Sequence, residues 1–317
     1  MASFVISNLD ASEFTFENIN FKKLVCNNSY YLELKKRWQD DYNATFTAVA
    51  DDNLVVAPII KNQGLLGVVD DICLLLSLVQ SKFIYCPEYI MGEKPTQTHY
   101  DRGHYYRVGK PTAGKWVNDD KIEPFLNSAV KILRESEFGE RSGFIAASYY
   151  LLVGDSDEIG EVSFILPWMA LETLANAYAE KDGISTILHS NNFKEIVKPA
   201  VIEVLNQLEK EERLTAGQKE LIISKLPELN RPSIRYKICK LRDAYGWDFI
   251  TNRLLGDYIE LRDNLMHLGT LGGVKLARVQ DLSIKLHLSM YLALINLIGC
   301  SEYISNLDSL KIQIKGN

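Results

Sequence analysis

Arginine, aspartate and histidine side chains that could carry out acid–base chemistry occur close together at Arg262, Asp263 and His267. An imidazole can give and take protons near neutral pH, and a guanidinium stays charged and presents a planar set of donors to an anion. Asp263 and His267 are four residues apart, so on a helix the carboxylate can contact the ring and orient it. The 3.6-residue period places Arg262 and His267 about 140° apart around the axis. One helix therefore does not direct both groups at a single atom, whereas two copies facing each other across a dimer axis could.

The residues around this cluster indicate the end of a helix. The leucines that recur at a helical spacing are Leu261, Leu265 and Leu268. Gly269 comes next, where a left-handed residue commonly closes the last turn. A glycine-rich stretch at 269–273 and a long apolar helix follow.

Residues 258–269 resemble the Arg-x4-His motif of HEPN domains, helical bundles many of which are metal-independent endoribonucleases. The family pattern has a polar residue directly after the arginine, and Asp263 fits it. Upstream, residues 164–175 contain Ala-Leu-Glu-Thr-Leu and resemble the opening helix of the Apea-like HEPN subgroup. The resemblance covers roughly the last half of the chain.

This resemblance implies RNA cleavage without a metal or other cofactor. The ribose 2′-hydroxyl attacks the adjacent phosphate, which leaves a 2′,3′-cyclic phosphate and a 5′-hydroxyl. His267 suits the proton transfers and Arg262 suits the charge on the phosphate. Asp263 would fix the tautomer of the ring, and Asn264 could donate a hydrogen bond to a phosphate oxygen. In the family two protomers pair these helices, so a homodimer with a composite site is implied.

A structural explanation of the same residues stays open. A histidine at a helix end can cap its own carbonyls, with Arg262 paired to Asp263 or Glu260, and many HEPN domains only dimerise or bind. Glu172 lies on an apolar helix, where a charge is unusual. It could support the Arg262 and His267 cluster, but a buried salt bridge, with Arg262 itself as one candidate partner, is the favoured interpretation.

The remaining histidines give weaker signals. The segment at 99–104 has two histidines and an aspartate but no third firm ligand, so it is interpreted as a polar loop. His287, on the expected last helix, is interpreted as a core or interface residue. His189 stands alone.

Composition predicts a soluble cytoplasmic protein. The net charge of -6 shows no excess of basic residues, so any contact with RNA should be local and transient. The five cysteines form no Cys-x-x-Cys pair, which favours free thiols in a reducing compartment. The first residues lack a signal-peptide pattern. The apolar runs at 64–79 and 286–300 are shorter than the roughly 20 residues that span a bilayer, so no membrane contact is expected.

The pattern of the elements predicts an α+β protein, with a β-rich N-terminal domain at 1–118 and an all-α, HEPN-like helical bundle at 119–317. Expected strands lie at 4–6, 14–21, 42–49, 54–60 and 83–86, the last stopped by Pro87, and a further strand lies near 105–108. A helix is expected at 64–80. Further helices are expected at 121–134, 144–153, 162–180, 193–214, 218–226, 233–244, 254–268 and 275–307. Gly154, Gly183 and Gly246 are expected helix stops.

These observations give two hypotheses of different classes. The first is a HEPN endoribonuclease of a prokaryotic defence or toxin-like system, in which residues 1–118 sense or dock something. The second is a non-catalytic HEPN dimer that binds a protein or RNA. In either case a regulatory protein or an antitoxin is a possible partner.

Overall fold

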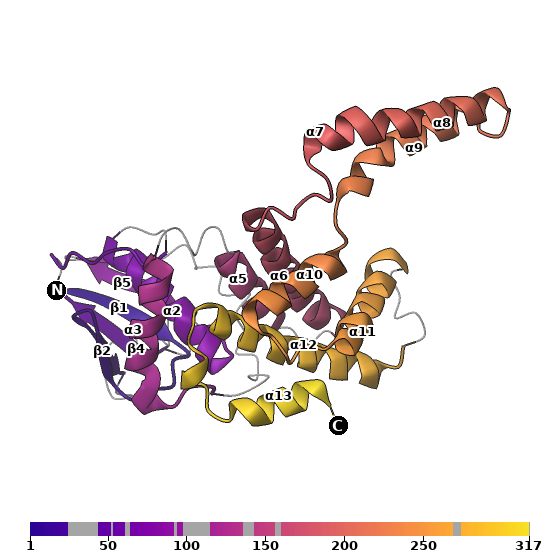
Figure 1. Ribbon diagram of the computed structural model, residues 1–317. Helices are drawn as coiled ribbons and strands as arrows, with labels where there is room; N and C mark the ends of the chain where they lie inside the picture. Colours follow the sequence, from indigo (N-terminus) through magenta and orange to yellow (C-terminus); the bar gives the residue numbers. More distant parts are fainter. Residues whose placement is uncertain are drawn as a thin grey trace.

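The computed structural model describes residues 1–24, 44–51, 53–60, 64–91, 94–97, 115–135, 143–155, 160–268 and 274–316. Within these ranges it does not describe the side chains at 44, 45, 88, 91, 94–97, 155, 160–162, 267 and 268. The sheet is formed by the N-terminal part of the chain, and helices form the rest (Figure 1). The predicted α+β class with a β-rich N-terminus is confirmed.

In the described residues, six strands form one antiparallel sheet in the order β2-β3-β4-β1-β5-β6. The strands are β1 (Ala2–Ser7), β2 (Phe14–Phe16), β3 (Ile19–Lys23), β4 (Ala44–Ala50), β5 (Tyr85–Met91) and β6 (Lys94–Gln97). Phe4 of β1 pairs with Ala48 on one side and Tyr89 on the other. The apolar strand β1 is thus paired along both edges, which agrees with its burial.

Residues 14–21 form a hairpin whose two-residue turn is Glu17-Asn18. Phe16 pairs with Ile19, and the turn residues have φ of 47° and 65°. Positive φ at both central positions defines the turns whose twist matches that of paired strands. The hairpin thus places the carboxylate of Glu17 beyond the end of β2.

The prediction of a strand at 54–60 is wrong for the described residues 53–60, which are irregular. In this segment, side chains form hydrogen bonds with backbone groups that would otherwise pair with a neighbouring strand. The guanidinium of Arg134 donates to the carbonyls of Ala57 (2.6 Å) and Pro58 (3.2 Å). The N–H of Ile60 donates to Asp71 (3.1 Å).

The prediction that Pro87 stops a strand is also wrong, because β5 runs through it. The register between β1 and β5 shifts between Val5 and Ser7, opposite the proline. Proline lacks the N–H that a regular ladder uses, and within sheets it is tolerated at such irregularities.

The helices account for most of the remaining described residues. They are α2 (Gly64–Gln80), α3 (Ile122–Arg134), α5 (Phe144–Asp155), α6 (Gly160–Lys181), α7 (Ser190–Asn192), α8 (Lys198–Lys210), α9 (Ala216–Lys225), α10 (Ile234–Tyr245), α11 (Asn252–Asp263), α12 (Leu276–Leu297) and α13 (Leu307–Lys315). Short 3-10 or π turns are η1 (Asp119–Lys121), η2 (Phe193–Val197), η3 (Leu226–Asn230), η4 (Asn264–Leu268) and η5 (Ser301–Tyr303). Helices α2 and α3 pack against the sheet (Figure 1).

Two of the three expected glycine stops are confirmed. Gly183 and Gly246 have φ of 70° and 65° and follow α6 and α10. Helix α5 instead continues through Gly154, where a Cβ would lie 2.9 Å from the Cδ of Pro167 on α6. That glycine permits close approach of two helices rather than ending one. The helix expected at 275–307 divides into α12 and α13, because Gly299 adopts φ of 67° between them.

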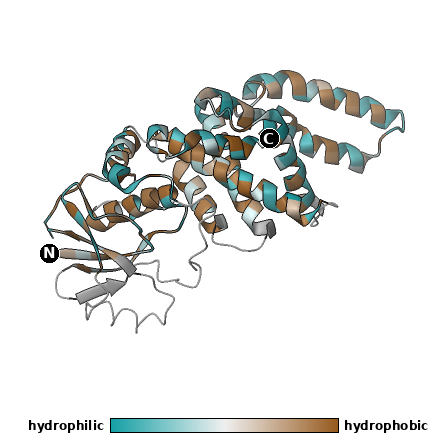
Figure 2. Ribbon diagram, turned by 90° about the horizontal axis from the view of Figure 1, so that it is seen from below, coloured by the Kyte–Doolittle hydropathy of each residue, from teal (hydrophilic) through white to brown (hydrophobic). Residues whose placement is uncertain are grey.

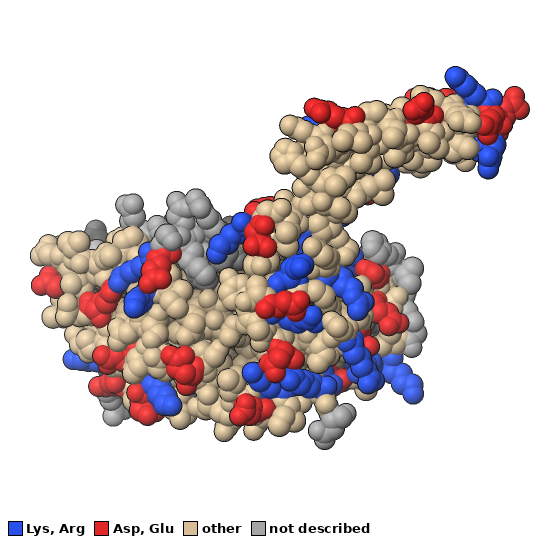
Figure 3. Space-filling view, viewed as in Figure 1, with Lys and Arg blue, Asp and Glu red and all other residues tan. Residues whose placement is uncertain are grey.

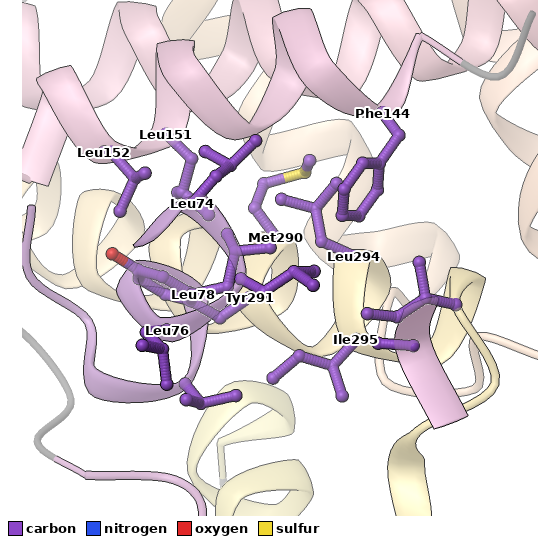
Figure 4. Packing of buried hydrophobic residues seen from close by; sticks show 14 of the residues in the cluster. Leu74, Leu76, Leu78, Phe144, Leu151, Leu152, Met290, Tyr291, Leu294 and Ile295 are labelled. Atoms are coloured by element: carbon purple, nitrogen blue, oxygen red, sulfur yellow. The ribbon is translucent and has the colours of Figure 1, made fainter. Parts of the chain in front are cut away.

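One group of buried apolar side chains joins elements on both sides of the predicted domain boundary. Leu74 and Leu78 of α2 lie with Leu151 of α5 and Met290 and Tyr291 of α12 (Figure 4). The rings of Trp116 and Tyr291 are in contact at a tilted angle, with centroids 5.5 Å apart. The domain boundary at residue 118 stays a prediction, and separating the chain there would expose these buried side chains. None of the described helices is long and apolar enough to cross a membrane.

Candidate anion-binding site at the end of α11

The helix that carries Arg262 is fixed at its start by a cap and along one face by the core. Thr251 accepts a hydrogen bond from the N–H of Leu254 (3.2 Å), which satisfies one of the donors that a helix start leaves unpaired. Leu255, Tyr258 and Leu261 are buried at a helical spacing. Arg262 therefore follows a buried leucine and emerges at the edge of the core.

The chain does not continue as a regular α-helix beyond Asp263. Helix α11 ends where the N–H of Asn264 donates to the carbonyls of Glu260 and Leu261, four and three residues earlier. Residues 264–268 then form the π turn η4. A π turn has i to i+5 bonds and so more residues per turn than an α-helix. The backbone positions 262 and 267 are consequently closer around the axis than the angle expected from a regular α-helix. Single π turns inside helices are frequent at functional sites.

Helix α6 supplies the partner of Arg262. Its apolar face includes the buried Trp168, and Glu172 follows one turn later. The indole N–H of Trp168 donates to Oε1 of Glu172 at 2.8 Å. The same oxygen lies 3.3 Å from Nη2 of Arg262. Glu172 thus forms an ion pair with Arg262, the candidate partner named for it, although the pair is partly exposed rather than buried.

Arg262 is held between two carboxylates and keeps one buried donor without an acceptor. Its Nη1 lies 2.9 Å from Oδ1 of Asp263. The side chains of Arg262 and Glu172 are each 25% exposed, whereas that of Asp263 is 52% exposed. Among the described residues, the Nε–H of Arg262 is buried and has no hydrogen-bond partner. A buried charged donor without an acceptor costs free energy, and an incoming oxygen could reach this Nε–H only if the side chains that cover it move.

The predicted site residues are only partly brought together by the described contacts. Arg262, Asp263 and Glu172 form one ion-paired group. Asn264 is partly buried at the start of η4. His267 lies on η4, but its side chain is outside the described residues, as is Gly269. The contact between Asp263 and His267 therefore stays a prediction.

The other histidines agree with structural roles where they are described. His287 is buried on α12 with Nδ1 2.9 Å from the carbonyl oxygen of Ser283, and burial lowers its pKa to about 4. His189 caps α7 by accepting from the N–H of Asn191. The segment at 99–104 lies outside the described residues. Within the described part of the chain, no three side chains of the metal-binding types are grouped as a metal site.

Three contributors to this region were not recognised in the sequence. Trp168 precedes Glu172 by four residues, a helical spacing that could have identified it. Lys237 of α10 donates to Asn176 (2.9 Å), one turn beyond Glu172, and this contact depends on how α10 packs against α6. One stripe of hydrogen-bonding groups on α6 thus meets both α11 and α10, and it consists of the indole N–H of Trp168, Glu172 and Asn176.

A second unrecognised group is the carboxyl pair on α2. Burial, followed by the neighbouring charge of Asp71, raises the pKa of Asp70 to about 7. Burial raises the pKa of Asp71 to about 6, against the hydrogen bond from Ile60 that lowers it. The sequence signal was two adjacent aspartates inside an otherwise apolar helix.

Arg262 is the cation of this group, and its two carboxylate partners give the group a net charge of -1, so an anion would bind the guanidinium only by displacing Asp263 or Glu172. Comparisons with protein-family models, with curated proteins and with solved structures gave no match. The function is therefore argued from the residues alone.

Proposed function

We propose that the chain is a metal-independent endoribonuclease of the HEPN type that cleaves RNA at a composite site in a homodimer. Arg262 would hold the phosphate, and His267 would transfer the protons. In this reaction the 2′-oxygen loses its proton and bonds to phosphorus, and the 5′-oxygen leaves and gains a proton. The products are a 2′,3′-cyclic phosphate and a 5′-hydroxyl. A role in a prokaryotic defence or toxin-like system, with residues 1–118 as a regulatory part, belongs to the same proposal.

The observation that carries the proposal is the environment of Arg262. The guanidinium is positioned by Glu172, which is in turn fixed by Trp168, and its Nε–H lacks an acceptor among the described residues. A preorganised cation with an unused donor suits a phosphate oxygen. The π turn that follows alters the helical spacing between positions 262 and 267. Asp263 and Asn264 would support the ring and the phosphate, respectively.

A second candidate is a non-catalytic dimer that binds a protein or RNA. The observation in its favour is that two carboxylates already balance the charge of Arg262. A phosphate would have to compete with Asp263 or Glu172 for the guanidinium. If it cannot, the ion pairs serve only to join α6 and α11.

The test is cleavage of total RNA in the presence of EDTA. We expect activity in the wild type, with 2′,3′-cyclic phosphate ends, and a loss of more than about 100-fold in both Arg262→Ala and His267→Ala. Arg253→Ala is the matched control, since Arg253 is an exposed arginine on the same helix. Activity that persists in His267→Ala would contradict the proposal. RNA binding without cleavage in all variants would favour the second candidate.

A further inference from the structure

Residues 187–230 form a helical hairpin that projects away from the rest of the molecule (Figure 1). It comprises α7, η2, α8, α9 and η3, and is called the projecting hairpin below. At its base, the side chain of Asn230 accepts from the N–H of Leu188 (2.8 Å) and donates to the carbonyl of Leu188 (2.9 Å). At its tip, Thr215 and Gln218 form a capping box at the start of α9. The hairpin is thus a defined element with fixed ends.

The projecting hairpin buries little apolar surface of its own. The apolar side chains that are buried within it are Phe193, Leu205 and Leu226. Large apolar side chains that it exposes are Ile187, Leu188, Ile196, Val204, Leu221, Ile222 and Leu229. These seven are nearly half of the fifteen exposed large apolar side chains in the described chain, although the hairpin has only 44 residues. Such a concentration of exposed apolar side chains is typical of interaction surfaces.

The exposed apolar residues follow the helices rather than being scattered. Ile196 of η2 and Ala200 and Val204 of α8 recur every four residues and are exposed, and Ile196 and Val204 are 67% and 58% exposed. Val201 is partly buried and Leu205 is buried, and α8 packs against α9. Hydrophobic segments recur along both hairpin helices in Figure 2. On the face seen in Figure 3, charged residues gather at the far tip of the hairpin, and the middle is mostly uncharged apart from acidic groups along its upper edge.

We infer that the projecting hairpin docks antiparallel against the same hairpin of a second copy of this chain, forming a four-helix bundle. Within one hairpin, α8 and α9 each bury one face against the other. The hairpin of a second copy would cover their exposed apolar faces, as the helices of a four-helix bundle do. A two-fold contact uses the same patch on both copies, so it must be self-complementary. The charges of the hairpin meet that requirement.

The base half of the hairpin is slightly basic and the tip half is acidic. Residues 187–200 and 223–230 contain three lysines and two glutamates, for a net charge of +1. Residues 201–222 contain three basic and five acidic residues, for a net charge of -2. An antiparallel arrangement places each base beside the partner's tip, where the opposite net charges attract. A parallel arrangement would place like charges together.

The test is the sedimentation mass of the full chain across micromolar concentrations. We expect the wild type to be dimeric and Ile196→Glu/Val204→Glu to dissociate at least about tenfold more readily. Ile312→Glu is the matched control, because Ile312 of α13 is 61% exposed and lies outside the hairpin. A monomeric wild type, or a double variant as dimeric as the control, would overturn the inference. Since all three positions are exposed, the fold should survive, and far-UV circular dichroism checks this.

A charge-reversal cycle tests the antiparallel arrangement separately. Lys194→Glu/Lys198→Glu in the base and Glu211→Lys/Glu212→Lys in the tip should each weaken the dimer. Their combination restores opposite charges and should recover the wild-type affinity. Failure of the combination to recover it would overturn antiparallel pairing. A monomeric wild type would contradict both this inference and the homodimer of the proposed function. A wild-type dimer that the hairpin variants do not weaken would contradict this inference alone, and loss of RNA cleavage in all variants would leave it untouched.

Discussion

Glu172 of α6 and Arg262 of α11 form an ion pair of 3.3 Å in which the carboxylate is also fixed by the indole of Trp168. The two residues are 90 positions apart in the chain. Their pairing joins α6 to the end of α11, where the proposed site lies. Whatever the activity, the guanidinium is held at one place by this contact.

This pair should contribute measurably to stability. Because each side chain is only 25% exposed, removal of Glu172 leaves a partly buried cation with one partner fewer. We expect Glu172→Ala to lower the free energy of unfolding by about 1–2 kcal/mol. A double-mutant cycle with Arg262→Ala should give a coupling free energy of about 0.5–2 kcal/mol. Asp263→Ala is the control and should cost under about 0.5 kcal/mol, since Asp263 is largely exposed. Additive effects of Glu172→Ala and Arg262→Ala would show that the pair is not coupled.

Arg134 at the end of α3 should anchor two segments of the N-terminal region. Its guanidinium binds both carboxylate oxygens of Glu17 and the carbonyls of Ala57 and Pro58. We expect Arg134→Ala to lower the free energy of unfolding by about 1–3 kcal/mol in denaturant titrations, because several charge-assisted bonds are lost. Lys131→Ala, on an exposed site of the same helix, should have little effect. Equal effects of both variants would contradict the anchoring role.

Asp70 should make stability depend on pH. Its folded pKa of about 7 exceeds the ordinary value of 3.8, so the folded chain holds the proton more tightly than the unfolded chain. The free energy of unfolding should therefore fall as pH rises from about 4 to about 7. Asp70→Asn should flatten this dependence and raise stability at pH 8 by about 1–3 kcal/mol, given about 1.4 kcal/mol per pKa unit. Asp120→Asn, at an exposed site, is the control, and an unchanged pH profile in Asp70→Asn would contradict the prediction.

Two glycines on helices should respond to alanine with opposite signs. A Cβ at Gly154 would lie 2.9 Å from Cδ of Pro167 and 3.0 Å from Cβ of Leu166. We expect Gly154→Ala to lower the melting temperature, with a cost of about 1–3 kcal/mol, because α5 and α6 must separate. At Gly256 on α11 a Cβ would meet nothing within 4 Å, so Gly256→Ala should stabilise by up to about 1 kcal/mol. Two changes of the same sign would contradict the close approach of α5 and α6.

The sequence by itself determined the α+β class, most helix positions and the confirmed glycine stops, because periodicity and caps are local properties. It also led to Glu172 as a partner of Arg262, since a lone charge on an apolar helix requires one. Tertiary structure decided that 53–60 is irregular, that β5 runs through Pro87 and that Gly154 serves packing. Residues 57–60 are irregular because Arg134 and Asp71, from other elements, bond their backbone groups. Strand β5 accommodates Pro87 through a shift in register with β1, and Gly154 is set by the approach of α6. All three causes lie in other elements of the structure. The ion pair between Arg262 and Glu172 likewise depends on how α11 packs against α6.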